Sequence, residues 1–135
     1  MYLRNMQKST VVIGAIFIVI AIVLGAFGAH ALKEILTDEK LASFETGVRY
    51  QLFHGLSLLM FGLLDDRISF RMKLVSGLLT AGTCLFSFSI YFLAVSETIG
   101  VSMKWLGPIT PIGGLLLIIG WVFFIAQVLR DKQKA

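Results

Sequence analysis

One stretch of sequence decides the fold: residues 11–32 read VVIGAIFIVIAIVLGAFGAHAL and carry no formal charge. About 20 apolar residues in a row are enough for a helix to cross the ~30 Å hydrocarbon core of a bilayer. Three further uncharged stretches follow, at residues 50–64, 74–96 and 105–129. The four stretches predict an all-α fold, an integral membrane four-helix bundle. The predicted spans are residues 11–32, 46–64, 74–96 and 108–129.

The composition leaves little room for a soluble domain beside these spans. Of the 135 residues, 57% are hydrophobic and 15% are charged, whereas soluble domains carry about 25% charged residues. A soluble helical bundle would need a polar face on each helix, but residues 11–29 and 74–95 are apolar nearly all round. We therefore expect one domain, residues 1–135. The single cysteine, Cys84, excludes an intrachain disulfide.

The distribution of lysine and arginine predicts the orientation. With four spans, eight basic residues share the side of the two termini and the middle loop: Arg4, Lys8, Arg67, Arg71, Lys73, Arg130, Lys132 and Lys134. The other side carries four: Lys33, Lys40, Arg49 and Lys104. The positive-inside rule then places both termini in the cytoplasm. Because the basic residues flank the spans and form no continuous stripe, we expect no nucleic-acid partner.

The second uncharged stretch, residues 50–64, is short for a span. Apolar residues recur at helical spacing before it, at Leu41, Phe44 and Val48. This pattern predicts a short amphipathic helical segment that leads into the second span, with Thr37 or Asp38 as its N-cap. We expect one long tilted helix over residues 38–64, whose first part lies at or above the outer interface.

Two prolines mark the start of the fourth span. Pro108 and Pro111 each lack an N–H, and each disfavours helix in the residue before it. Pro111 suits the first turn of the fourth helix, with Thr110 as the N-cap.

Small residues in the first and fourth spans predict close helix packing. They are Ala21, Gly25, Gly28, Ala29, Gly113 and Gly114. Small side chains let helix backbones approach closely, and lipid offers no hydrophobic drive for association. In the first span the favoured interpretation is packing against the second span. The alternative is oligomerisation through the same face.

Histidine supplies the only side chains within the four uncharged stretches that titrate near neutral pH, at His30 and His54. Such groups are costly in a membrane and mark function by default. With the predicted topology, both imidazoles lie at similar depth in the outer leaflet, where the third and fourth spans also deliver hydroxyl groups. The candidate site is a ligand-binding or structural polar cluster: His30, Gln51, His54, Ser87, Ser89, Tyr91 and Thr110.

Several interpretations of this cluster stay open. The favoured one is a hydrogen-bond network that holds four helices together. His30 and His54 could instead ligate a haem, as residues in bundle cores do. No carboxylate or thiol lies nearby, so we expect no other metal. A site for a proton or a small polar ligand is a further alternative, because imidazole titrates near neutral pH. We identify no catalytic residue, since the spans hold no acid and no paired carboxylates.

Four motifs in order resemble a known family. They are Leu24-Gly-Ala-Phe-Gly-Ala-His30, Tyr50-Gln-Leu-Phe-His54, Phe86-Ser-Phe-Ser-Ile-Tyr91, and Thr110-Pro-Ile-Gly-Gly114 followed by Gly120-Trp121. Over residues 11–128 the chain is similar to the domain of unknown function 423 family, also described as the transmembrane protein 256 family. The resemblance implies four spans and, for a bacterial member, a plasma-membrane location. It implies no activity. One departure is Phe88, which stands where the family tends to have glycine.

The sequence therefore predicts a non-enzymatic accessory or interaction protein of the plasma membrane. Its expected partners are the lipid bilayer and either a second copy or another membrane protein. We expect no cofactor, with haem as the alternative. The second functional hypothesis is a protein that binds or conducts a small ligand, ion, lipid or haem through the polar cluster. An enzyme ranks third.

Overall fold

The computed structural model of the chain describes residues 7–64 and 71–131, and it is dominated by helices. They are α1 (Lys8–Ala29), α2 (Ala31–Ile35), α3 (Asp38–Leu63), α4 (Arg71–Thr83), α5 (Ser89–Ser96) and α6 (Ile109–Asp131). A π-helical segment, Cys84–Phe88, joins α4 to α5, and a 3-10 turn, Lys104–Leu106, precedes α6. Four residues used for the predicted orientation lie outside the described residues: Arg4, Arg67, Lys132 and Lys134.

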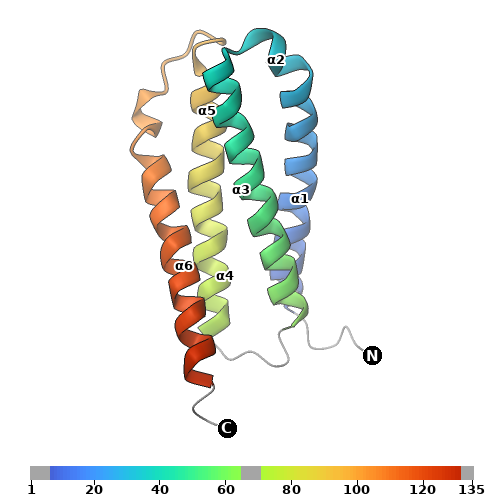
Figure 1. Ribbon diagram of the computed structural model, residues 1–135, viewed down its shortest axis with the longest axis vertical. Coiled ribbons are helices and arrows are strands. Elements are labelled where there is room, and N and C mark those ends of the chain that lie inside the picture. The colour runs from blue at the N-terminus through green and yellow to red at the C-terminus, as the bar shows by residue number, and fades with distance from the viewer. Residues whose placement is uncertain (1–6, 65–70, 132–135) are drawn as a thin grey trace.

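The helices form a bundle of four columns (Figure 1), namely α1, α3, α4 with α5, and α6. The start of α1, the end of α3, the start of α4 and the end of α6 lie together at what we call the lower end. The short α2 and the connection from α5 to α6 lie at the upper end. Helix α1 packs mainly on α3, and α4 packs mainly on α6. The bundle is therefore two helix pairs, joined where α3 meets α4 and α5.

Within the described residues, three helical segments are long and apolar enough to cross a membrane: Lys8–Ala29, Met72–Ser96 and Lys104–Arg130. Large apolar side chains face outward along them, for example Val19 on α1, Phe92 on α5 and Ile118 on α6. This confirms the predicted all-α fold with membrane-capable helices. Helix α3 is not among the three, because Arg49, Gln51 and His54 lower the mean hydropathy of its more apolar half. Its role as a fourth span stays a prediction.

Two buried apolar clusters hold the columns together. The lower cluster contains Phe17, Leu58, Met72, Val75, Leu79 and Leu117. The upper cluster contains Leu36, Phe44, Tyr91 and Ala94, with Leu41 and Val48 packed against it. The apolar stripe that precedes the second uncharged stretch therefore faces the core. The N-cap prediction for α3 is also confirmed, because the Thr37 side chain accepts a hydrogen bond from the Lys40 N–H at 3.4 Å.

The helix boundaries differ from the predictions at two places. Helix α1 ends at Ala29, and His30 is the junction between α1 and the short α2. The prediction that Thr110 caps the fourth helix is wrong, because α6 already begins at Ile109. Pro111 lies in the first turn, as predicted, where a missing N–H costs no intrahelical bond.

Candidate functional site

Gln51 lies at the centre of the buried polar side chains, with an exposed fraction of 0%. Its Nε2 donates a hydrogen bond to the Phe17 carbonyl oxygen at 2.9 Å. Its Oε1 accepts one from the Tyr91 hydroxyl at 2.7 Å. One side chain of α3 thus bonds to both α1 and α5. Because both ends of the amide are engaged, Gln51 fixes how these helices sit against α3.

Two serines at the junction of the π-helical segment and α5 lie at contacts with neighbouring helices. The Ser87 hydroxyl donates to the Gly47 carbonyl oxygen of α3 at 2.8 Å. The Ser89 hydroxyl donates to the Phe86 carbonyl oxygen at 2.9 Å and lies 2.7 Å from the Thr110 hydroxyl. Since the single Ser89 hydroxyl proton goes to Phe86, the Thr110 hydroxyl is the donor in the second bond. Ser87 therefore connects the π-helical segment to α3, and Ser89 connects α5 to α6.

His54 uses both ring nitrogens inside the bundle. Its Nδ1 lies 2.7 Å from the Tyr50 carbonyl oxygen. The Trp121 indole Nε1 of α6 donates to its Nε2 at 3.0 Å. A carbonyl oxygen only accepts and an indole N–H only donates, so the ring carries its proton on Nδ1 and is neutral. A protonated His54 could not accept the hydrogen bond from Trp121.

His30 is separate from this network. It is exposed at the junction of α1 and α2, on a surface pocket that it shares with Lys33 and Glu34. The Gly28 backbone faces the Phe44 ring, whereas Gly14 faces the Gly55 backbone, so α1 and α3 run antiparallel. Ten residues separate Phe44 from His54, so at 1.5 Å per residue His54 lies roughly 15 Å below the level of Gly28. The prediction that the two histidines lie at similar depth is wrong.

The remaining predicted side chains form separate hydrogen-bonded groups at different levels of the bundle and do not form one layer. Thr110 lies near the start of α6 and Trp121 eleven residues later, which is roughly 16 Å along the helix axis. The predicted second span, residues 46–64, has His54 one or two turns below its outer interface. The inward face of α3 instead begins earlier, at buried Phe44 and Gly47, while the charged side chains between them and Gln51 point outward. We define the polar network as Gln51, His54, Ser87, Ser89, Tyr91, Thr110 and Trp121.

The sealed polar atoms of the polar network all have hydrogen-bond partners within the protein. In the part of the chain that the structure describes, no side-chain nitrogen or oxygen atom sealed from solvent lacks a hydrogen-bond partner. The same part contains no group of three or more His, Cys, Asp or Glu residues that could hold a metal ion. The hydrogen-bonding capacity of the network is thus used to join helices.

The small residues of the first span face mainly inward. Ala21 is 2% exposed. A Cβ atom on Gly25 would lie 3.6 Å from the Val48 side chain, and one on Gly28 would lie 3.4 Å from the Phe44 ring. Ala29 is exposed. This arrangement matches the favoured interpretation, packing against α3.

The glycines of the fourth helix meet the π-helical segment. A Cβ atom on Gly113 would lie 2.4 Å from the Phe86 backbone nitrogen, closer than real Cβ contacts. One on Gly114 would lie 3.6 Å from the Phe86 ring. The absence of a side chain at Gly113 therefore permits backbone contact between α6 and the π-helical segment.

Sequence reasoning missed two features of this interior. It gave Trp121 no role as the partner of His54. It also overlooked the backbone contact between Gly14 and Gly55, where a Cβ atom on Gly14 would lie 2.7 Å from the Gly55 carbonyl oxygen. The spacing of Gly47, Gly55 and Gly62 could have revealed it, since steps of eight and seven residues keep glycines on one face of a helix.

Comparison with known proteins supports the family resemblance carried by the four sequence motifs. The family model described as "Protein of unknown function (DUF423)" matches residues 24–114. The chain belongs to this family. The DUF423 match covers the histidine motif of α1, the α3 motif and the π-helical segment. No solved structure matches the chain.

Curated relatives of this DUF423 chain are called membrane proteins. A UPF0382 membrane protein of Staphylococcus epidermidis is 39% identical over 124 residues, which is 92% of this chain and 98% of the relative. The UPF0382 membrane protein YwdK of Bacillus subtilis is 36% identical over 126 residues, again 92% and 98% of the two chains. The family and the apolar helices together identify a membrane protein of a family without an assigned function.

Proposed function

We propose that this protein is a non-enzymatic accessory or interaction protein of the bacterial plasma membrane, in which the polar network joins the helices. One observation carries the proposal: each predicted polar side chain of the network makes its hydrogen bonds to another part of the same protein. Buried polar groups that are fully satisfied rigidify a core and specify one packing arrangement. The role proposed for the network is therefore to stabilise the fold and not to take part in a reaction.

The ligand-binding alternative has less support. A ligand on the His54 ring would have to replace the Trp121 indole or the Tyr50 carbonyl oxygen. A haem held by two histidines needs both imidazoles on one iron, and the roughly 15 Å between the levels of His54 and Gly28 keeps His30 away from such a site. The proposal therefore includes no cofactor.

The outward faces of the bundle suit a membrane environment. Large apolar side chains are exposed along α1 and α6, including Val19, Ile22, Ile118 and Val122. On a soluble protein such faces would be an aggregation hazard. We propose that lipid covers α1, that the apolar second half of α3 completes the fourth crossing, and that α6 is the face offered to a second copy or to another membrane protein.

The orientation can be tested with single cysteines. In a Cys84→Ala background, Lys8→Cys reports the lower end and Ser102→Cys reports the upper end, and both side chains are exposed. The positive-inside rule places the lower end in the cytoplasm. A membrane-impermeant maleimide should then label Ser102→Cys in intact cells, and label Lys8→Cys after the cells are broken. Labelling of Lys8→Cys in intact cells would reverse the proposed orientation.

The accessory role can be tested by photocrosslinking in living cells. A photoreactive amino acid at Ile118, which is 62% exposed, should give one discrete protein adduct. The same probe at the neighbouring Leu117, which is 3% exposed, is the matched control and should give none. An adduct of twice the chain mass indicates a second copy, and another mass indicates a partner membrane protein. If Ile118 and its outward neighbours crosslink to lipid alone, the accessory role is wrong.

A further inference from the structure

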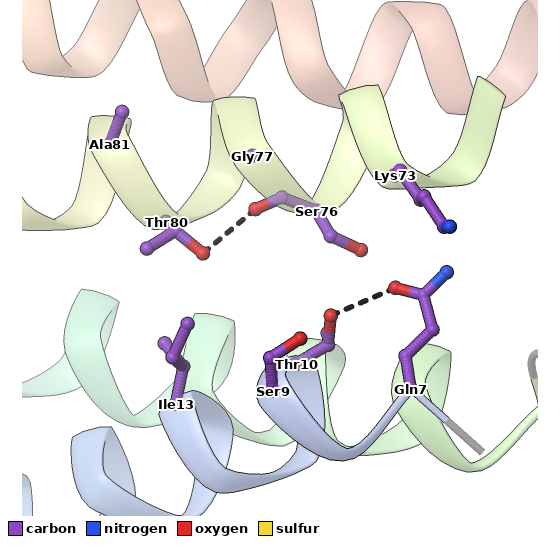
Figure 2. Close-up of a pocket in the computed structure, with 9 residues that line it drawn as sticks. All are labelled: Gln7, Ser9, Thr10, Ile13, Lys73, Ser76, Gly77, Thr80 and Ala81. Atoms are coloured by element: carbon purple, nitrogen blue, oxygen red, sulfur yellow. Dashed lines mark hydrogen bonds between the residues drawn. The ribbon is translucent and has the colours of Figure 1, made fainter. Parts of the chain in front are cut away.

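A pocket of about 720 Å³ opens between α1 and α4 at the lower end of the bundle, away from the polar network. Figure 2 shows side chains from the two helices facing one another across it. The lining residues are Gln7, Ser9, Thr10, Ile13, Lys73, Ser76, Gly77, Thr80 and Ala81. This seam lies between the two helix pairs, where α1 and α4 make little direct contact.

Ser76 gives the pocket its most informative feature. The residue is 6% exposed, and its side chain points from α4 into the pocket (Figure 2). Among residues 7–64 and 71–131, no hydrogen bond to the Ser76 hydroxyl is formed; only its backbone carbonyl oxygen is used, by the Thr80 hydroxyl at 2.8 Å. Since no sealed side-chain oxygen among the described residues lacks a partner, the Ser76 hydroxyl is open to the pocket and available to bond to a molecule held there.

The other groups in the pocket favour a negatively charged partner. Lys73 is the one charged residue among the nine that line it, and its ammonium is a donor only. The Ser9 hydroxyl lies opposite, on the first turn of α1. Helices α1 and α4 both begin at this end, and helix N-termini favour anions through their free N–H groups and dipoles. The Ser76 and Ser9 hydroxyls, the Lys73 ammonium and the helix N-termini can together bind the phosphate of a lipid headgroup.

The lining of the pocket also changes from polar to more apolar along the two helices. Lys73 and Gln7 lie at its lower end, whereas Ile13 and the exposed Ala81 lie six to eight residues further along their helices, roughly 10 Å towards the middle of the bundle. Gly77 leaves open space, since a Cβ atom there would meet nothing within 4 Å. A lining that is polar at the lower end and more apolar towards the middle of the bundle suits a molecule with a charged headgroup and acyl chains better than a free anion.

We propose that this pocket binds one anionic phospholipid, with its phosphate at Lys73 and Ser76 and the start of its acyl chains beside Gly77. The proposal rests on the membrane placement proposed above, but not on the accessory role. The lower end is also the side that the basic residues assign to the cytoplasm, whose leaflet is rich in anionic lipid.

The test measures lipid binding to the delipidated full chain in detergent, by native mass spectrometry and by thermal unfolding. Phosphatidylglycerol should bind as one molecule per chain and raise the unfolding temperature, whereas zwitterionic phosphatidylcholine should bind at least about tenfold more weakly. Lys73→Gln should weaken phosphatidylglycerol binding by about tenfold and Ser76→Ala by several-fold. The Ser76→Ala variant should fold normally, because no hydrogen bond within the described protein is lost.

Matched controls and a steric block separate this site from general lipid contact. Lys33→Gln at the upper end and Ser57→Ala on α3, whose hydroxyl bonds to its own helix, should leave binding unchanged. Gly77→Leu should fill the pocket and abolish binding without removing a charge. Equal binding of the two lipids, or no effect of the three pocket variants, would overturn the proposal. If inorganic phosphate competes at concentrations similar to phosphatidylglycerol, the ligand is a free anion and the lipid assignment is wrong.

These outcomes are separate from those of the accessory role. Specific lipid binding with no protein crosslink from Ile118 would leave the pocket in place and remove the proposed interaction function. A protein crosslink without lipid selectivity would do the reverse.

Discussion

The Trp121 indole donates a 3.0 Å hydrogen bond to His54 Nε2, and this bond connects α6 to α3 across the middle of the bundle. The two rings lie 6.1 Å apart between centroids and are tilted by 58°. Helix α6 otherwise packs mainly on α4 and on the π-helical segment. The Trp121–His54 pair is therefore one of the direct links between the two helix pairs.

A double-mutant cycle should show that this pair is coupled. His54→Phe and Trp121→Phe each remove the hydrogen bond, so the second substitution should cost less in the presence of the first. The coupling free energy should be about 0.6–1.7 kcal/mol, the range for hydrogen bonds between membrane helices. Reversible unfolding in mixed micelles measures it. His30→Phe combined with Trp121→Phe is the control and should show no coupling; equal coupling in both cycles would refute the assignment.

Replacing Gln51 should weaken the packing of α1 and α5 on α3. Gln51→Leu removes the hydrogen bonds to the Phe17 carbonyl oxygen and to the Tyr91 hydroxyl. We expect a loss of about 1–3 kcal/mol in the free energy of unfolding. Gln127→Leu is the matched control on α6, at a half-buried position outside the network, and should be nearly neutral. A neutral Gln51→Leu would show that the network does not hold the bundle together.

The backbone contact at Gly113 should tolerate no side chain. A Cβ atom there would lie 2.4 Å from the Phe86 backbone nitrogen, which is not a flexible group that can move aside. Gly113→Ala should therefore cost about 1–3 kcal/mol. Gly77→Ala is the control, since its Cβ atom meets nothing within 4 Å and alanine favours helix by up to about 1 kcal/mol. Thermal unfolding of the two variants should shift in opposite directions.

Local chemistry explains which parts of the fold the sequence could predict. The stretch at residues 11–32 predicts a helix because a backbone in lipid must satisfy its own hydrogen bonds. The cap at Thr37 follows from its hydroxyl and its place before a periodic segment. Neither inference needs knowledge of distant residues.

The features that the sequence did not reveal depend on contacts between distant segments. The π-helical segment lies where Phe86 meets the Gly113 backbone of another helix, so no local pattern marks it. The depth of His54 follows from the register of α1 on α3, fixed by Gly14 against Gly55. Similarly, the pocket at Ser76 exists because α1 and α4 begin side by side, although 63 residues separate Lys8 from Arg71.

The ion pair between Lys40 of α3 and Glu97 at the end of α5 should make stability depend on pH at the upper end. The hydrogen bond and the charge of Lys40 hold the pKa of the Glu97 carboxyl below its usual value of 4.5. A lowered pKa in the folded state means that the stabilisation is complete above the usual pKa and is lost as the pH falls through the lowered one. The difference in unfolding temperature between the wild type and Glu97→Gln should therefore be positive at pH 7, should shrink as the pH falls below the usual pKa of a glutamate, and should vanish below the lowered pKa of Glu97. Because Glu97 is exposed, the difference should also shrink at high salt. Glu34→Gln, at an exposed acid of α2, is the matched control; if its pH profile departs from the wild type in the same way, the effect does not come from the Lys40–Glu97 pair.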